Sequence, residues 1–149
     1  MLLSQLVAAA RTQGAKLLTG EDFRNVTLKK LAQVNNWRDP LPAKGTGVFL
    51  LAQGEPVEAE DLHLINRAYA ADYAGIAFRV TSGEPDVFSR LEAQVSHLAF
   101  PVLLLPVTMP PWEFQNWAYN IFPDLLGGSL LTPARLITSG LWLEEALAY

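Results

Sequence analysis

Three short runs of uninterrupted apolar residues constrain the fold of this chain more than any other feature. They stand in the segments GTGVFLLAQG (residues 45–54), GIAFRV (75–80) and PVLLLP (101–106). A run of this length between glycine, proline or polar residues is typical of a strand that is buried on both faces. Each run follows a segment with helical periodicity. A parallel sheet with covering helices buries such strands, so we predict an α/β fold with a mostly parallel sheet of about four to five strands and helices on its faces.

The N-terminal residues are predicted to form a helix rather than a signal peptide. Leu3, Leu6, Val7 and Ala10 recur at helical spacing, and Gly14 is favourable just past a helix end. No basic residue precedes this apolar run, as a signal peptide would require.

Residues 15–20 fit a short strand or turn, and residues 21–37 fit either a strand or one face of a helix. For the second segment we predict a strand. Its apolar positions are Val26 and Leu28, then Leu31 and Val34, with an interruption of the extended structure near Lys29-Lys30.

Two helical segments are predicted to connect the buried strands, and each has the length of a βαβ crossover. Residues 58–73 begin with acidic side chains and carry an inward stripe of Leu62, Ile65, Tyr69 and Tyr73. Residues 86–98 carry an inward stripe of Val87, Leu91, Val95 and Leu98.

The C-terminal part is predicted to be helical. Pro110 and Pro111 open an aromatic helix that Pro123 ends, and a last helix begins at Thr132-Pro133 and runs to Tyr149. The chain thus divides into an α/β domain, residues 1–123, and a C-terminal helical extension, residues 124–149. Apolar runs of the roughly 20 residues that span a membrane do not occur in the sequence, so no membrane partner is expected.

Composition excludes several classes of function. Asp and Glu outnumber Lys and Arg by 15 to 11, so the chain carries a net charge of −4 and is not expected to bind nucleic acid directly. Cysteine is absent, which excludes disulfides, thiolate nucleophiles and Cys-ligated metals and fits a cytoplasmic protein.

Catalytic and cofactor motifs are also missing from the sequence. It has no P-loop, dinucleotide-binding turn, GxSxG or HExxH, and His63 and His97 stand apart without a ligand pattern. We therefore expect no cofactor, no metal and no enzymatic activity. An enzyme is the weakest alternative, and it would need Asp39 or Glu55 to meet His97 as an acid–base pair.

Polar residues follow the predicted strands where ligands bind in open α/β sheets. Asn35, Asn36 and Thr108 follow two of them, and the candidate ligand-binding residues are Asn36, Gln53, Gly54, Arg79 and Thr81. Amides, hydroxyls and one guanidinium suit a small anionic or amide-bearing molecule. Arg79 would bind a carboxylate of this molecule through two hydrogen bonds. The alternative is structural: Arg79 pairs with Glu55 or Asp39, and the amides cap loops.

Tryptophans in the C-terminal third raise the possibility of self-association. Trp112, Trp117 and Trp142 are candidate interface residues, because Trp is enriched at interfaces and these lie near the chain end. The other interpretation is that the aromatic helix packs on the sheet and the last helix.

The order of these landmarks resembles the N-terminal domain of purine-catabolism regulator (PucR-like) transcription factors. A leading helix precedes a short element closed by Gly, here Leu18-Thr19-Gly20. A strand then ends in a turn like Gln53-Gly54, and two further strands are introduced by Ala74-Gly75 and Phe100-Pro101. The resemblance covers about residues 1–122.

The resemblance implies a regulatory, ligand-sensing domain that normally precedes a linker and a helix-turn-helix. Residues 123–149 are too short and not basic enough for that DNA-binding part. The chain is then a domain cut from a regulator or a free-standing relative. The family's inducers, nitrogen-rich purine breakdown products, suggest a class of ligand. We expect a cytoplasmic metabolite-sensing module that forms a homo-oligomer. The alternative is an oligomerisation or protein-interaction module without ligand.

Overall fold

A five-stranded sheet forms the centre of the computed structural model, which describes residues 1–41, 45–56, 59–81, 87–123 and 125. Four of the five strands are parallel, and the short β1 joins one edge antiparallel to β5. The spatial order is β1-β5-β4-β3-β2. The strands are β1 (Lys16–Leu17), β2 (Lys30–Val34), β3 (Val48–Ala52), β4 (Gly75–Arg79) and β5 (Val102–Leu105). The predicted α/β class and mostly parallel sheet are thus confirmed.

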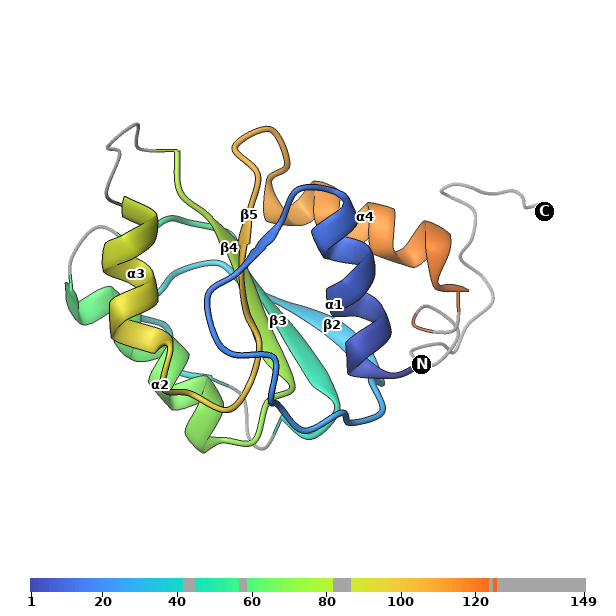
Figure 1. The fold of residues 1–149 in the computed structure, drawn as a ribbon, viewed down its shortest axis with the longest axis horizontal. Helices are drawn as coiled ribbons and strands as arrows, with labels where there is room; N and C mark the ends of the chain where they lie inside the picture. The colour runs from blue at the N-terminus through green and yellow to red at the C-terminus, as the bar shows by residue number, and fades with distance from the viewer. Residues whose placement is uncertain (42–44, 57–58, 82–86, 124, 126–149) are drawn as a thin grey trace.

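Helices cover both faces of this sheet, as Figure 1 shows. One face carries α1 and α4, and the other carries α2 and α3. The helices are α1 (Leu3–Thr12), the 3-10 helix η1 (Ala59–Leu62), α2 (His63–Ala70), α3 (Val87–Val95) and α4 (Pro111–Ile121). α2 and α3 are the crossovers from β3 to β4 and from β4 to β5, and the parallel strands β2 to β5 lie side by side in sequence order. β1 departs from this order, because it pairs with β5 at the edge opposite β2.

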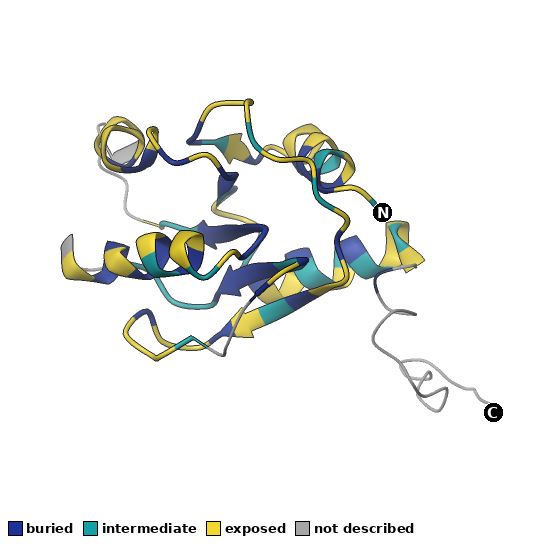
Figure 2. Ribbon diagram, turned by 90° about the horizontal axis from the view of Figure 1, so that it is seen from below, coloured by how far each residue is buried: buried dark blue, intermediate teal, exposed yellow. Residues whose placement is uncertain are grey.

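The apolar runs pack on both sides because successive strand residues point to opposite faces. Leu50 and Phe78 belong to the core under α2 and α3, whereas Leu51 and Ala77 belong to the core under α1 and α4. All four are at most 1% exposed. Figure 2 shows the buried strands between exposed outer surfaces of the helices. Continuous hydrophobicity in the sequence therefore reflects two separate cores.

Gly75 begins β4 at a point where a side chain would not fit. A Cβ atom there would lie 2.6 Å from Cε2 of Phe49 and 2.8 Å from the carbonyl oxygen of Pro101. The close approach of three neighbouring strands thus explains the glycine in the Ala74-Gly75 pair.

The segment before β2 differs from the predicted strand. Regular pairing begins only at Lys30, so the predicted strand is confirmed for Leu31 and Val34. Val26 and Leu28 lie before the interruption expected near Lys29-Lys30 and do not belong to this strand. Residues 26–28 instead pair with the N-terminus: the amide of Leu3 donates to Val26 (2.9 Å), and the amide of Leu28 donates to Met1 (2.8 Å). Their hydrogen bonds therefore anchor the start of α1.

The inward-facing stripe predicted for residues 58–73 also differs from the structure. Tyr69 is 43% exposed, although Leu62 and Ile65 are buried, because α2 ends at Ala70 and its last turn projects past the amino ends of the strands. In the second crossover the predicted burial of Leu91, Val95 and Leu98 is confirmed. The predicted last helix, from Thr132 to Tyr149, lies outside the described residues.

Candidate functional site

The carboxyl ends of β2, β3, β4 and β5 meet at one edge of the sheet, because these strands are parallel. This carboxyl edge carries all five candidate ligand-binding residues. Asn36 follows β2, Gln53 and Gly54 follow β3, and Arg79 and Thr81 end or follow β4. Some of these residues use their polar groups in hydrogen bonds within the fold, and others keep hydrogen-bond donors that are available to a ligand.

Gln53 and Arg79 lie side by side at this edge. In the register of β3 and β4, Leu51 is opposite Ala77, so two residues further along Gln53 is opposite Arg79. The amide of Gln53 still donates to the carbonyl of Val34 (2.8 Å), which shows that the extended backbone continues to this residue. Alternation from Leu51 and Ala77 directs both side chains to the face covered by α1 and α4.

The side-chain amide of Gln53 is buried without a hydrogen-bond partner among the described residues. Its Nε2 atom is the single buried side-chain nitrogen or oxygen of the described part of the chain that lacks one. Nε2 carries two N–H donors, and leaving them unbonded costs on the order of 1–3 kcal/mol. An acceptor supplied from outside the chain would remove this cost, and it reaches Nε2, which is shielded from solvent, only when the groups that cover this atom move.

Arg79 is held by the loop that leads to α4. Its Nη1 donates to the carbonyl oxygen of Val107 at 2.9 Å. Neither ion pair considered from the sequence, with Glu55 or with Asp39, is present among the contacts of the described residues. A guanidinium has five N–H donors, so one bond to a carbonyl leaves donors for a further acceptor.

Thr81 and Glu55 bond to each other across the ends of β4 and β3. The carboxylate of Glu55 accepts from the backbone amide of Thr81 at 2.9 Å and also from its hydroxyl. These two residues are again opposite each other in the extended register. Their polar groups thus prolong the pairing of β3 and β4, which fixes the position of Gln53 and Arg79 just before them.

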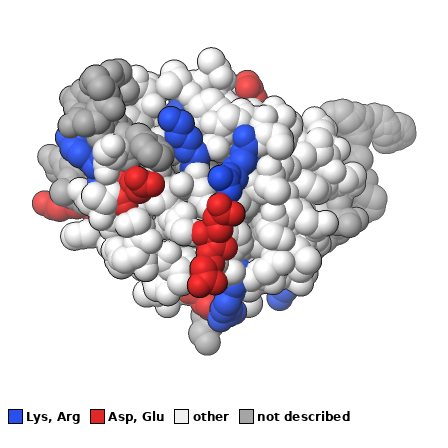
Figure 3. Space-filling view, viewed as in Figure 1, with Lys and Arg blue, Asp and Glu red and all other residues white. Residues whose placement is uncertain are grey.

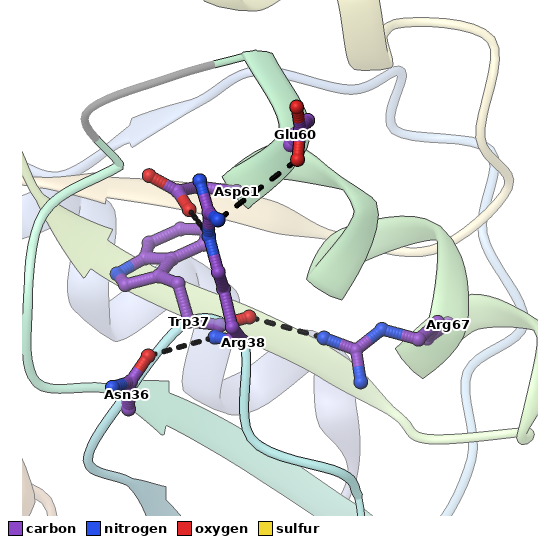
Figure 4. Close-up of polar contacts among 6 residues, drawn as sticks. All are labelled: Asn36, Trp37, Arg38, Glu60, Asp61 and Arg67. Atoms are coloured by element: carbon purple, nitrogen blue, oxygen red, sulfur yellow. Dashed lines mark hydrogen bonds and ion pairs between the residues drawn. The ribbon is translucent and has the colours of Figure 1, made fainter.

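Asn36 and Gly54 take part in a separate network on the α2 side, and Figure 4 shows Asn36 in it. Oδ1 of Asn36 accepts from the amide of Arg38 (2.9 Å), and the carbonyl of Gly54 accepts from Nε1 of Trp37 (2.7 Å). The Trp37 ring stands edge-on to Phe78, with ring centroids 5.0 Å apart. Asn36 and Gly54 therefore act structurally here, as the cap interpretation predicts.

Charged side chains fasten the loop after β2 to the start of the first crossover. Nε of Arg38 lies 2.8 Å from Oδ1 of Asp61, whose side chain is only 9% exposed. From α2, Arg67 donates to the carbonyl of Trp37 (3.0 Å), as Figure 4 shows, and to the carbonyl of Asp39 (2.9 Å). These bonds satisfy backbone groups of a loop without secondary structure and make this side of the edge rigid.

Two further amides connect the sheet to α4. Nε2 of Gln33, on β2, donates to Oε1 of Gln115, and Nε2 of Gln115 lies 3.4 Å from the hydroxyl of Tyr119. Burial raises the pKa of Tyr119, and bonds from Gln115 and the Leu31 backbone oppose the shift. Gln33 and Gln115 are thus partnered, in contrast to Gln53.

A hollow of about 490 Å³ lies at the opposite edge, where the parallel strands begin. We call it the amino-edge hollow; its lining includes Asp22, Arg24, Tyr69, Asp72, Tyr73 and Phe100. The hollow was not predicted from the sequence, since its residues come from loops that only the sheet brings together. In the sequence, the one signal that could have indicated this hollow was Tyr69, a large aromatic residue in the last turn of a crossover helix.

Other candidate residues lie apart from both places. Trp112 is 53% exposed on α4, whereas Trp117 is half-buried with its ring 5.2 Å from that of Phe114; Trp142 is outside the described residues. His97 follows α3 at the amino edge, so the sheet separates it from Asp39 and Glu55 at the carboxyl edge. Within the described ranges, groups of three or more His, Asp or Glu side chains suited to a metal ion do not occur.

Charged side chains of both signs are interspersed on the face drawn in Figure 3, where blue, red and blue side chains follow one another down the middle and further ones lie to the sides. Arg11 and Glu21 form an exposed ion pair of 3.4 Å. A surface of both signs differs from the broad basic surface that phosphate backbones attract. Among the described helices, none has the length and hydrophobicity needed to cross a membrane.

No protein-family model, curated protein or solved structure matches this chain.

Proposed function

We propose that this chain is a regulatory domain that senses a small metabolite at the carboxyl edge of its sheet. Gln53 and Arg79 contact the metabolite in this proposal. The buried, unpartnered Nε2 of Gln53 beside the Arg79 guanidinium is the observation that carries it. The resemblance to the N-terminal domain of PucR-like regulators supports a sensing role within transcription regulation, without direct DNA contact by this chain.

The available groups define the chemistry of the ligand. Gln53 and Arg79 both offer N–H donors, so the ligand must offer oxygen acceptors. A carboxylate takes two parallel bonds from a guanidinium, and a carbonyl oxygen of a ureide or amide suits a neutral side-chain amide. A small carboxylate that also bears an amide or ureide group satisfies both residues. Such a ligand agrees with the nitrogen-rich class that the resemblance suggests.

Thermal unfolding with a panel of small carboxylates and ureides tests the proposal. A ligand at about 100 times its Kd stabilises the folded state by about 2.7 kcal/mol, which raises the Tm of a domain of this size by roughly 5–10 °C. Gln53→Met and Arg79→Met should each remove most of this rise. Arg11→Met, which removes a guanidinium from an exposed ion pair, should retain it.

The proposal fails if no compound of the panel raises the Tm. It also fails if a compound raises the Tm equally in the unchanged protein and in both carboxyl-edge variants. In either case the unpartnered amide of Gln53 has no part in ligand binding.

A second candidate function is self-association through α4. Trp112 and Val107 are large apolar residues that are 53% and 57% exposed, and Trp is enriched at interfaces. Light scattering at rising concentration tests it, with Trp112→Glu as the variant that should shift the protein towards a monomer. If the protein without substitutions stays monomeric at millimolar concentration, self-association through α4 is excluded.

A further inference from the structure

We propose that the amino-edge hollow binds a small organic cation, such as a methylated ammonium group. This site is separate from the carboxyl edge, because the two lie at opposite ends of the parallel strands. The inference does not depend on the proposed sensing function. It rests on the shape of the hollow, its aromatic surface and the balance of charge around it.

Aromatic rings form much of the surface of the hollow. Tyr73 and Phe100 are only 6% and 5% exposed and form its floor, whereas Tyr69 is 43% exposed and stands at its rim. The rings of Tyr69 and Phe100 have centroids 5.2 Å apart and planes at 60°. The two rings contact each other edge to face, and both residues line the hollow. A cation within about 6 Å of a ring centroid is attracted by the negative face of the ring.

Negative groups outnumber positive ones around this aromatic surface. Asp22 and Asp72 contribute two carboxylates against the one guanidinium of Arg24. Helix α2 ends at Ala70, two residues before Asp72, so the negative end of its dipole is also at the hollow. Among the ion pairs of the described residues, none involves Asp22 or Asp72. Both carboxylates are exposed and can approach a ligand cation.

The position of Asp72 is fixed by its backbone. Its φ of 69° places it in the left-handed region, and its amide donates to the carbonyl of Tyr69 at 3.2 Å. Its Oδ2 lies 3.4 Å from the hydroxyl of Thr46, on the loop before β3. The carboxylate is therefore held near the rim by two loops, with the Tyr69 and Phe100 rings adjoining the same hollow.

Size and charge together favour a cation of several heavy atoms. A volume of about 490 Å³ is in the range of small-molecule pockets. A bare metal ion would leave the aromatic floor uncovered, and an anion would face two carboxylates and a helix carboxyl end. Arg24 is exposed at the rim, so its guanidinium can turn towards solvent when a cation enters.

Choline and its neutral analogue 3,3-dimethylbutan-1-ol provide a matched pair of probes with the same shape. Titration of the full chain, followed by the aromatic ¹H–¹³C NMR signals of Tyr69, Tyr73 and Phe100, should show saturable shifts with choline. The neutral analogue should bind at least about fivefold more weakly, because it lacks the charge that the rings and carboxylates attract.

Two substitutions that remove charges of opposite sign test the inference further. Asp72→Asn keeps a residue that tolerates the left-handed conformation and should weaken choline binding about three- to tenfold. Arg24→Ala removes the like charge and should strengthen binding by a similar factor. Arg79→Met alters only the carboxyl edge and should leave choline binding unchanged, which separates this site from the proposed sensing site.

Three results would overturn the inference. They are equal affinity for choline and the neutral analogue, no saturation by choline up to about 100 mM, and weaker choline binding in Arg24→Ala. The last result would assign the hollow to an anion instead.

Discussion

The indole N–H of Trp37 donates a hydrogen bond of 2.7 Å to the carbonyl oxygen of Gly54. It connects the loop after β2 to the turn after β3, directly next to Gln53. Since Trp37 is only 4% exposed, loss of this bond would leave a polar backbone group poorly satisfied at the carboxyl edge.

Trp37→Phe should therefore lower the free energy of unfolding by about 1–2 kcal/mol, because the aromatic volume is largely kept and the donor is lost. Urea unfolding measures the change. Trp112→Phe is the matched control: Trp112 is 53% exposed, and its substitution should change stability by less than about 0.5 kcal/mol. Equal effects of the two substitutions would show that the bond to Gly54 does not stabilise the fold.

Gln53→Met should leave stability unchanged or raise it by up to about 1 kcal/mol in the absence of ligand, because it removes a buried donor that has no partner. Gln33→Met removes an amide that bonds to Gln115 and should not stabilise the protein. Urea unfolding of the two variants makes the comparison. A destabilisation of more than about 1 kcal/mol by Gln53→Met would mean that its amide is satisfied in the folded protein.

Gly75→Ala should destabilise the protein by about 2–3 kcal/mol, because the new methyl group would overlap Phe49 and the Pro101 carbonyl. Gly20→Ala is the control, since the nearest atom to a Cβ there is the Asp22 amide nitrogen at 4.0 Å. Thermal or urea unfolding distinguishes them. Similar stability of the two variants would show that the strands around Gly75 can separate without cost.

Asp61→Asn should lower the free energy of unfolding by about 1–2 kcal/mol, because the Asp61 side chain is 9% exposed and its carboxylate bonds to Arg38. The Arg38 side chain is 55% exposed, so solvent weakens the pair and keeps the effect below that of a fully buried one. Glu60→Gln alters the longer contact of 3.9 Å to the same arginine, and it should cost less than about 0.5 kcal/mol. If both substitutions had the same small effect, the Asp61 contact would be no more than a surface ion pair.

Stability should also fall at alkaline pH through Tyr119. Burial raises the pKa of its hydroxyl above the usual 10.0, so the folded protein holds this proton more tightly than the unfolded chain. The resulting stabilisation is complete below about pH 10 and is lost as the pH rises from there through the raised pKa. Urea unfolding at about pH 8 and about pH 10.5 should show a smaller loss in Tyr119→Phe than in the unchanged protein. An identical loss in both would exclude this contribution.

Local patterns in the sequence were sufficient for most of the fold. The apolar runs predicted β3, β4 and β5, and the helical spacing of Leu3, Leu6 and Val7 predicted α1, since burial on both faces of a strand or on one face of a helix leaves a direct periodic signal. The segment around Val26 and Leu28 was ambiguous because its pairing partner, the N-terminus, is distant in sequence.

The candidate site was predictable only as a set of positions. Strand order and direction bring Asn36, Gln53 and Arg79 to one edge, and this follows from the parallel sheet that the apolar runs imply. Which of these residues keeps a free donor depends on Trp37, Arg38 and Glu55, which reach the edge from separate loops.

The sequence by itself determined the class of fold and the edge where candidate residues gather, because apolar periodicity and strand direction are local properties. Tertiary structure alone decided that the Gln53 amide is buried without a partner while Asn36 and Gly54 are bonded within the fold. It also created the amino-edge hollow from Asp22, Tyr69 and Phe100, residues far apart in the chain. The physical reason is that hydrogen-bond satisfaction and cavity shape depend on side chains that meet only after the sheet has assembled.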